Sequence, residues 1–138
     1  MRRLIDLYLN RQFLKFLLAG GLAALANFAS RFAFEAFMGY AASICAAFVV
    51  GLMTAFTLNR IFVFPASTKP LRAEMSWFFL FNLLTLPFVI GVAIALTEAF
   101  ALAIPIGYAK SIAHAIAIVL PVFVNFVAHK FITFAKAR

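Results

Sequence analysis

Four long apolar stretches dominate this chain and restrict it to one class of fold. They cover about residues 13–37, 41–64, 75–97 and 108–134, and each is long enough for the roughly 20 residues with which a helix crosses a hydrocarbon core. Because 67% of the residues are hydrophobic and only 12% are charged, a water-soluble domain of this length could not cover its apolar surface. The sequence therefore predicts an all-α integral membrane protein with four transmembrane helices.

The start of the chain allows two interpretations. Arg2 and Arg3 precede an apolar run that reaches small residues at 24–26, which imitates a secretion signal. A signal peptide should release a polar domain, whereas more membrane-spanning sequence follows here, so we predict that this run remains as the first transmembrane helix. In residues 1–11, apolar and charged residues alternate at helical spacing, which predicts a short amphipathic helix on the membrane surface.

The basic residues flank the predicted spans unevenly. Of the 12 Lys and Arg residues, only Arg31 and Lys110 fall on one side of a four-helix topology. The positive-inside rule then predicts a multi-pass protein of the inner, cytoplasmic membrane with both termini and the central loop in the cytoplasm. A net charge of +8 could also indicate nucleic-acid binding. Charges that flank spans ordinarily meet anionic lipid headgroups, so we expect membrane lipids and no nucleic acid as partners.

Short motifs recur in the same order in the two halves. Glu-Ala-Phe occurs at 35–37 and 98–100, Gly-Tyr-Ala at 39–41 and 107–109, and a polar residue followed by a cation opens the last aromatic turn at 59–64 and 129–134. An insertion at 101–106 lengthens the second turn. We therefore predict one membrane domain over 1–138, built from two tandem two-helix repeats at about 12–64 and 74–134, related by an axis along the membrane normal.

Polar and small residues inside the spans fall on one face of each helix. The simplest packing turns these stripes inward, because an unpaired polar group in hydrocarbon is costly. The stripes are Gly20, Ala24, Asn27, Arg31 and Glu35; Ser43, Ala47, Thr54 and Thr57; Asn82 and Thr85; and Lys110, His114, Ala117, Pro121 and Asn125.

Eight polar residues in or beside the spans are candidates for contact with a substrate. An ionisable residue within a span indicates function by default, and an amide is a costly way to pack. The structural alternatives are snorkelling of Arg31 and Lys110, paired with Glu35 and Glu98, simple anchoring by the cytoplasmic cations, and helix packing by the amides. The candidates are Asn27, Arg31, Asn59, Arg60, Lys110, His114, Asn125 and Lys130.

The arrangement of these candidates favours one chemical class of ligand. Cations stand at both membrane faces, amides and hydroxyls lie between them, and no carboxylate lies in mid-span. That pattern suits an anionic headgroup with hydroxyls, such as a sugar phosphate, and argues against a small multidrug-type exporter of lipophilic cations. No metal-ligand cluster, activated nucleophile or phosphate-binding Gly-rich loop is present in the sequence. We therefore expect no enzyme activity, no catalytic residue, no metal and no cofactor.

The chain resembles the GtrA-like family of four-span membrane proteins over about residues 12–134. The resemblance rests on Phe-Leu-Lys-Phe at 13–16 leading to Gly-Gly at 20–21, Asn27, Asn-Arg-x-Phe-Val-Phe at 59–64, Tyr-Ala-Lys at 108–110, Asn-Phe at 125–126, and His-Lys-x-x-x-Phe at 129–134. His129 and Lys130 depart from the Asn-Arg that is more usual in the second copy, and the pair Arg31 and Glu35 is not part of the family pattern.

The resemblance implies a role in modifying cell-envelope polysaccharide. Family members are thought to flip a polyprenyl-phosphate-linked monosaccharide from the cytoplasmic to the outer leaflet, beside a membrane glycosyltransferase. The alternative is a non-transporting anchor or scaffold for that glycosyltransferase. Because four helices enclose little volume, a homo-oligomer is expected, with a dimer favoured. Under the flippase hypothesis, Arg60 and Lys130 collect the phosphate at the cytoplasmic face, Asn27 and Asn125 contact sugar hydroxyls, and Arg31 with Lys110 receive the phosphate outside.

Overall fold

The computed structural model describes residues 2–136, without the side chains of residues 4, 40, 41 and 118. Arg138, one of the cations behind the predicted orientation, and the Leu4 side chain of the predicted amphipathic face lie outside this description. Within the described residues the secondary structure is entirely helical. The elements in chain order are α1 (Arg2–Tyr8), α2 (Arg11–Glu35), α3 (Tyr40–Leu58), η1 (Asn59–Val63), α4 (Leu71–Phe100), α5 (Ile106–Ala128) and η2 (His129–Thr133).

The four predicted spans and the short N-terminal helix are confirmed. Four helices in the described part of the chain are long and apolar enough to cross a membrane. Asn10 begins the first of them, because its side chain accepts a hydrogen bond of 2.8 Å from the Phe13 amide and satisfies one of the free donors of a helix start. Pro70 and Pro105 precede α4 and α5, where their fixed backbone suits an extended approach to a helix.

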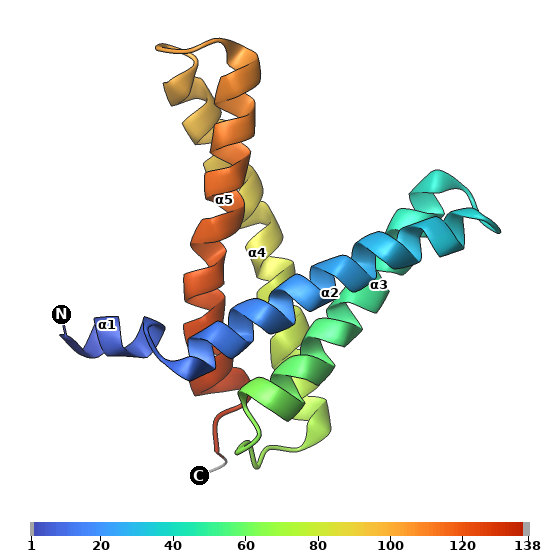
Figure 1. The fold of residues 1–138 in the computed structure, drawn as a ribbon, viewed down its shortest axis with the longest axis vertical. Coiled ribbons are helices and arrows are strands. Elements are labelled where there is room, and N and C mark those ends of the chain that lie inside the picture. Colours follow the sequence, from blue (N-terminus) through green and yellow to red (C-terminus); the bar gives the residue numbers. More distant parts are fainter. Residues whose placement is uncertain (1, 137–138) are drawn as a thin grey trace. The chain divides into compact units, whose positions relative to one another are not determined.

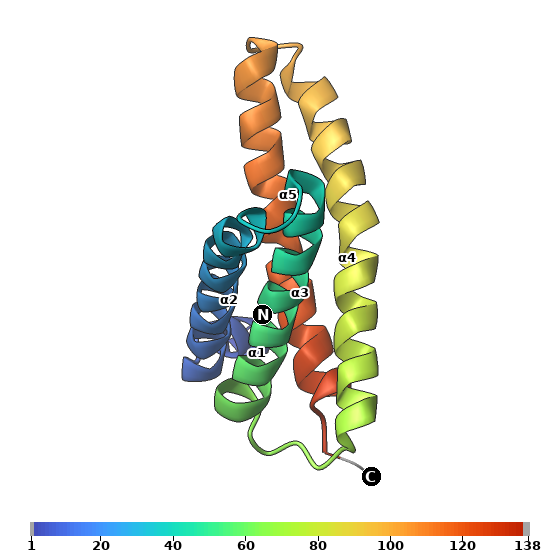
Figure 2. The ribbon, with the colours of Figure 1, turned by 90° about the vertical axis from the view of Figure 1, so that its right-hand side faces the viewer.

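The chain divides into two compact units. One comprises the residues up to Lys69 together with those from Phe134, and the other is Pro70–Thr133. In the first unit, α2 and α3 form an antiparallel hairpin, hairpin one, joined at the turn after Glu35 (Figure 1). In the second, α4 and α5 form hairpin two, joined at the turn after Phe100 (Figure 2).

The second helix of each hairpin carries small buried residues at every fourth position, on one face. In α3 these are Ser43, Ala47 and Gly51, and in α5 they are Ala109, Ala113 and Ala117. Small side chains let the backbones of neighbouring helices approach closely within a membrane protein. Each hairpin therefore packs through a small-residue stripe on its returning helix.

Each returning helix ends in a π-helical segment. In η1 the Phe64 amide donates a 2.8 Å hydrogen bond to the Asn59 carbonyl, five residues earlier. The second π-helical segment, η2, begins at His129, so both segments coincide with the recurring terminal motif. π-Helical turns are rare and often occur at functional sites. The shared order of helix, helix and π segment fits the predicted tandem repeat, which stays a prediction.

The predicted inward stripes are partly wrong. Gly20 and Ala24 are exposed, and α2 instead buries Ala19 and Ala23, one position earlier on the helix. Thr57, Lys110 and His114 are exposed as well. The sequence marks which residues share a face, but the partner helix decides which of two neighbouring faces is buried.

Candidate functional site

One face of α5 carries polar side chains towards both ends of the helix. Lys110 and His114 are exposed, Asn125 is half-buried, and the buried Pro121 lies between His114 and Asn125 on the same face. At about 1.5 Å per residue, Lys110 and Asn125 are about 22 Å apart along the helix axis, most of a hydrocarbon core of about 30 Å. We call this set the polar face of α5.

A groove in hairpin two lies at the C-terminal end of the polar face of α5. Its volume is about 210 Å³, and Thr85 and Asn125 are its hydrogen-bonding side chains, surrounded by apolar ones. Aromatic and aliphatic walls with a few convergent polar groups are typical of ligand sites. The full lining is Phe81, Leu84, Thr85, Phe88, Pro121, Val124 and Asn125.

The hydrogen bonds of the groove leave one amide nitrogen available. The Thr85 hydroxyl lies 2.7 Å from the Phe81 carbonyl and 3.1 Å from Oδ1 of Asn125, and it is placed to donate to either oxygen. The side-chain nitrogen of Asn125 makes no hydrogen bond with any described residue. It is therefore left as a donor for a ligand hydroxyl.

One proline in each helix of hairpin two interrupts the backbone hydrogen bonding of that helix. Pro87 lies inside α4 and Pro121 inside α5, and proline has no amide proton to give to the carbonyl four residues earlier. The carbonyls of Leu83 and Ala117 therefore lack their usual helical donor. In a bilayer such groups must be satisfied by neighbouring protein, water or a ligand.

The polar residues that open the two π segments are buried. Asn59 is 2% exposed and its amide nitrogen donates a 2.7 Å hydrogen bond to the Ala55 carbonyl. His129 is also 2% exposed; it stacks on Phe78 at 4.6 Å between ring centroids, meets Phe81 edge to face, and has Nδ1 3.0 Å from the Thr133 hydroxyl. Both side chains act in packing, and a substrate contact predicted for Asn59 is not accessible in this structure.

The cations that follow these two residues point outward. Arg60 is exposed, and Lys130 is half-exposed with its Nζ 5.5 Å from the centroid of the Phe126 ring and 5.8 Å from that of Phe131. In each π segment, the polar residue is therefore buried while the next residue, the cation, remains accessible. Both cations are therefore at least partly exposed at the ends of their hairpins.

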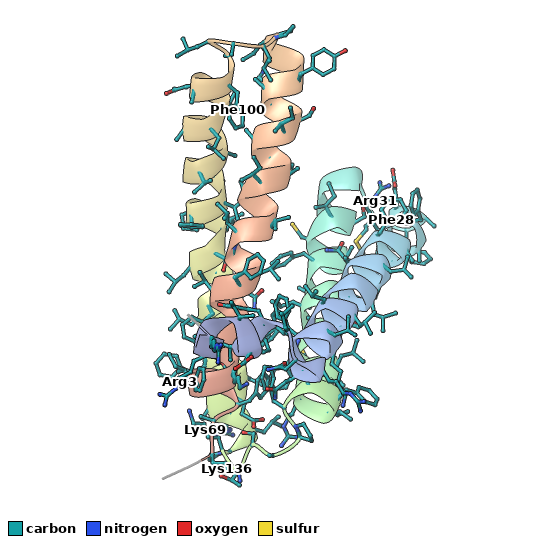
Figure 3. The ribbon with its side chains drawn as sticks, turned by 60° about the vertical axis from the view of Figure 1, so that its left-hand side comes forward. Arg3, Phe28, Arg31, Lys69, Phe100 and Lys136 are labelled. Atoms are coloured by element: carbon teal, nitrogen blue, oxygen red, sulfur yellow. The ribbon has the colours of Figure 1, made fainter. Side chains whose placement is uncertain are left out.

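Arg31 is engaged by its own helix. Its guanidinium forms a 3.1 Å ion pair with Glu35 and lies 4.2 Å from the centroid of the Phe32 ring and 5.9 Å from that of Phe28, which is labelled beside it in Figure 3. This matches the structural alternative for Arg31. By contrast, no ion pair joins Lys110 to Glu98 among the described residues, so the pairing expected in the alternative for Lys110 is absent, and its snorkelling stays a prediction.

Asn27 lies at the closest approach within hairpin one. A Cβ atom added to Gly51 would lie 2.7 Å from Cβ of Asn27 and 3.3 Å from the Ala23 carbonyl oxygen. The Asn27 side chain is half-buried, and its amide makes no hydrogen bond with any other described residue. It thus combines a packing contact with an amide that can still bind a ligand.

Glu74 is a buried carboxyl group that the sequence pattern does not single out. It is fully buried in the first turn of α4, where the positive end of the helix dipole favours its charge. Its place just after Pro70, before the apolar run, is typical of an ordinary helix start, which explains why the pattern misses it. No group of His, Cys, Asp and Glu side chains in the described residues could hold a metal ion.

Comparison with known proteins gives one match. Residues 15–134 match the family model described as GtrA/DPMS, transmembrane domain. No curated protein and no solved structure matches the chain.

Proposed function

Because the chain belongs to the GtrA/DPMS transmembrane-domain family, we propose that this multi-pass membrane protein moves a polyprenyl-phosphate-linked monosaccharide from the cytoplasmic to the outer leaflet of the inner membrane. The moved lipid would serve cell-envelope polysaccharide modification, after a membrane glycosyltransferase has made it. The protein would catalyse no covalent step itself.

The observation that carries this proposal is the polar face of α5. Lys110, His114 and Asn125 lie on a helix that is otherwise apolar enough to cross a membrane, and Asn125 lines the groove. Exposing such groups to lipid alone is costly. A ligand with an anionic group and several hydroxyls would satisfy the ammonium group, the amide and the free carbonyls together.

The exposed cations of the π segments have a separate role in this scheme. Arg60 and Lys130 would meet the lipid phosphate at the cytoplasmic face, and the planar guanidinium of Arg60 suits phosphate better than an ammonium group. Lys110 would receive the phosphate at the outer face. Because Arg31 is held by Glu35, we propose that Lys110 takes this role without it. Asn125 and Asn27 would contact sugar hydroxyls.

The alternative function is a scaffold that holds a glycosyltransferase without moving lipid. It is favoured by the engagement of Arg31, Asn59 and His129 in contacts within their own units. The scaffold needs no accessible polar face on α5, so substitutions there separate the two functions.

The test is a transbilayer assay. The purified full chain is reconstituted in liposomes with a fluorescent polyprenyl-phosphate sugar, and a membrane-impermeant quencher reads the fraction in the outer leaflet over time. We expect faster exchange with the protein than without it. Lys110→Gln should slow it about tenfold or more, because it removes a charge-assisted hydrogen bond to the phosphate, worth about 1.4 kcal/mol or more. Asn125→Leu should slow it about threefold to tenfold, because it removes a neutral hydrogen bond worth about 0.7–1.4 kcal/mol.

The matched control is Lys136→Gln, which removes an exposed cation of the C-terminal segment and should leave the rate unchanged. Helical circular dichroism confirms the fold of each variant. Unaccelerated exchange with the unaltered protein would eliminate the flippase and leave the scaffold. If the unaltered protein accelerates exchange and both α5 variants do so equally, the polar face of α5 is not part of the lipid's route.

A further inference from the structure

Hairpin one carries a second groove, which we call the Lys15 groove. Its volume is about 240 Å³, and its lining comes from α2, from the end of α3 and from η1. Apart from Lys15, every lining residue is apolar. The lining is Lys15, Leu18, Ala19, Leu22, Leu58 and Phe62.

The Lys15 groove is apolar, and the one charged side chain of its lining, Lys15, stands at one end of it. Lys15 is exposed in the second turn of α2, whereas Leu22 lies about 10 Å farther along the helix axis. Ala19 is buried and forms the floor, while Leu18, Leu22 and Phe62 are exposed at the walls. Under the predicted orientation, the lysine lies at the cytoplasmic interface and the apolar end reaches into the bilayer.

The ammonium group of Lys15 is available to an external anion. It forms no ion pair with any described residue, and no carboxylate lines the groove. Arg60, although it lies between Leu58 and Phe62 in sequence, is not part of the lining either.

We propose that the Lys15 groove binds an anionic phospholipid of the cytoplasmic leaflet. The phosphate lies at the Lys15 ammonium, and one acyl chain runs along Leu18, Leu22 and Phe62. Charge complementarity supports this occupant, because the cytoplasmic leaflet carries anionic lipids that basic residues attract by about 1 kcal/mol each.

The lining excludes the two other candidate occupants. A lipid-linked sugar brings hydroxyls that need donors and acceptors, and the Lys15 groove offers no amide, hydroxyl or other polar side chain besides the lysine. An apolar helix of a second copy would cover the ammonium group without an anion, which is costly. The inference does not depend on the proposed function, since a scaffold would also bind the lipid.

Lipid retention tests the proposal. The full chain in mild detergent is equilibrated with equal amounts of phosphatidylglycerol and phosphatidylcholine that carry the same acyl chains, and the bound lipids are quantified by mass spectrometry. We expect about a fivefold preference for phosphatidylglycerol, the ratio that corresponds to about 1 kcal/mol. Lys15→Gln should bring the ratio close to one, whereas Lys136→Gln should preserve it.

A second pair of variants tests the groove itself. Leu22→Trp fills it and should lower the total lipid retained at least about threefold, whereas Leu25→Trp, also exposed on α2 but outside the lining, should not. An unchanged ratio in Lys15→Gln, or unchanged retention in Leu22→Trp, overturns the proposal. Displacement of phosphatidylglycerol by an equal amount of a polyprenyl-phosphate sugar overturns it too, because the groove would then serve the transported lipid.

Discussion

At the scale of single residues, Asn59 and His129 occupy equivalent places and are buried in different ways. The Asn59 amide nitrogen donates to the Ala55 carbonyl, while its oxygen, also buried, accepts no hydrogen bond from any described residue. His129 instead uses two aromatic rings of α4 and a hydroxyl of its own segment. At both places the first motif residue is therefore buried, and the second, the cation, is at least partly exposed.

This division predicts opposite effects for His129 and Lys130. His129→Ala should lower the free energy of unfolding by about 2–5 kcal/mol, because it leaves a cavity against Phe78 and Phe81. Lys130→Ala should change it by less than about 1 kcal/mol, since its ammonium group is half-exposed. Thermal unfolding in detergent measures both, and His129→Phe, which keeps an aromatic ring, should lose less than His129→Ala. Equal losses at the two positions would contradict the assignment.

At the scale of elements, hairpin one depends on a single close approach. Gly51 faces Asn27 and Ala23 so closely that no side chain fits without a shift of one helix. The corresponding stripe of α5 consists of alanines: Ala109, Ala113 and Ala117 are all fully buried. The two hairpins thus use the same kind of stripe, with glycine at the closest point of hairpin one and alanine at the buried positions of hairpin two.

Gly51→Ala should therefore destabilise the protein by about 1–3 kcal/mol, the usual cost of overpacking. Gly91→Ala is the matched control: nothing lies within 4 Å of its added Cβ, and alanine favours a helix over glycine by about 0.5–1 kcal/mol. Unfolding in detergent measures each variant. In the double variant with Asn27→Gly, the loss should be less than additive, with a coupling of at least about 0.5 kcal/mol. Strict additivity would show that the two positions do not touch.

At the scale of the whole molecule, the distribution of charge sets the orientation proposed for the chain. Cations gather at the ends of the hairpins away from the turns at 36–39 and 101–105. The positive-inside rule then predicts that those two turns lie at the outer face of the inner membrane and that the linker containing Ala66 lies at the cytoplasmic face.

Cysteine accessibility measures this orientation. In a Cys45→Ala background, Leu102→Cys, whose position is 91% exposed, should react with an impermeant maleimide in intact cells. Ala66→Cys, in the exposed linker, should react only after permeabilisation. The reverse pattern would invert the topology and, with it, the direction proposed for Arg60 and Lys110.

The amino-acid sequence by itself determined the four spans, the short helix before them, both turns and the positions of the two terminal motifs. These features depend on local composition and spacing. The sequence shows them directly, because each transmembrane helix must be apolar over its own length. The family resemblance is also confirmed, because residues 15–134 match the family model.

Only the tertiary structure decided which polar groups are accessible. It buried Asn59 and His129, turned α2 so that Ala19 rather than Gly20 is covered, and stacked the Phe134 ring on Phe64 at 5.2 Å. It also formed the π turns and both grooves. The reason is that a polar side chain takes its partner from whichever element packs against it, and spacing along one helix does not specify that element.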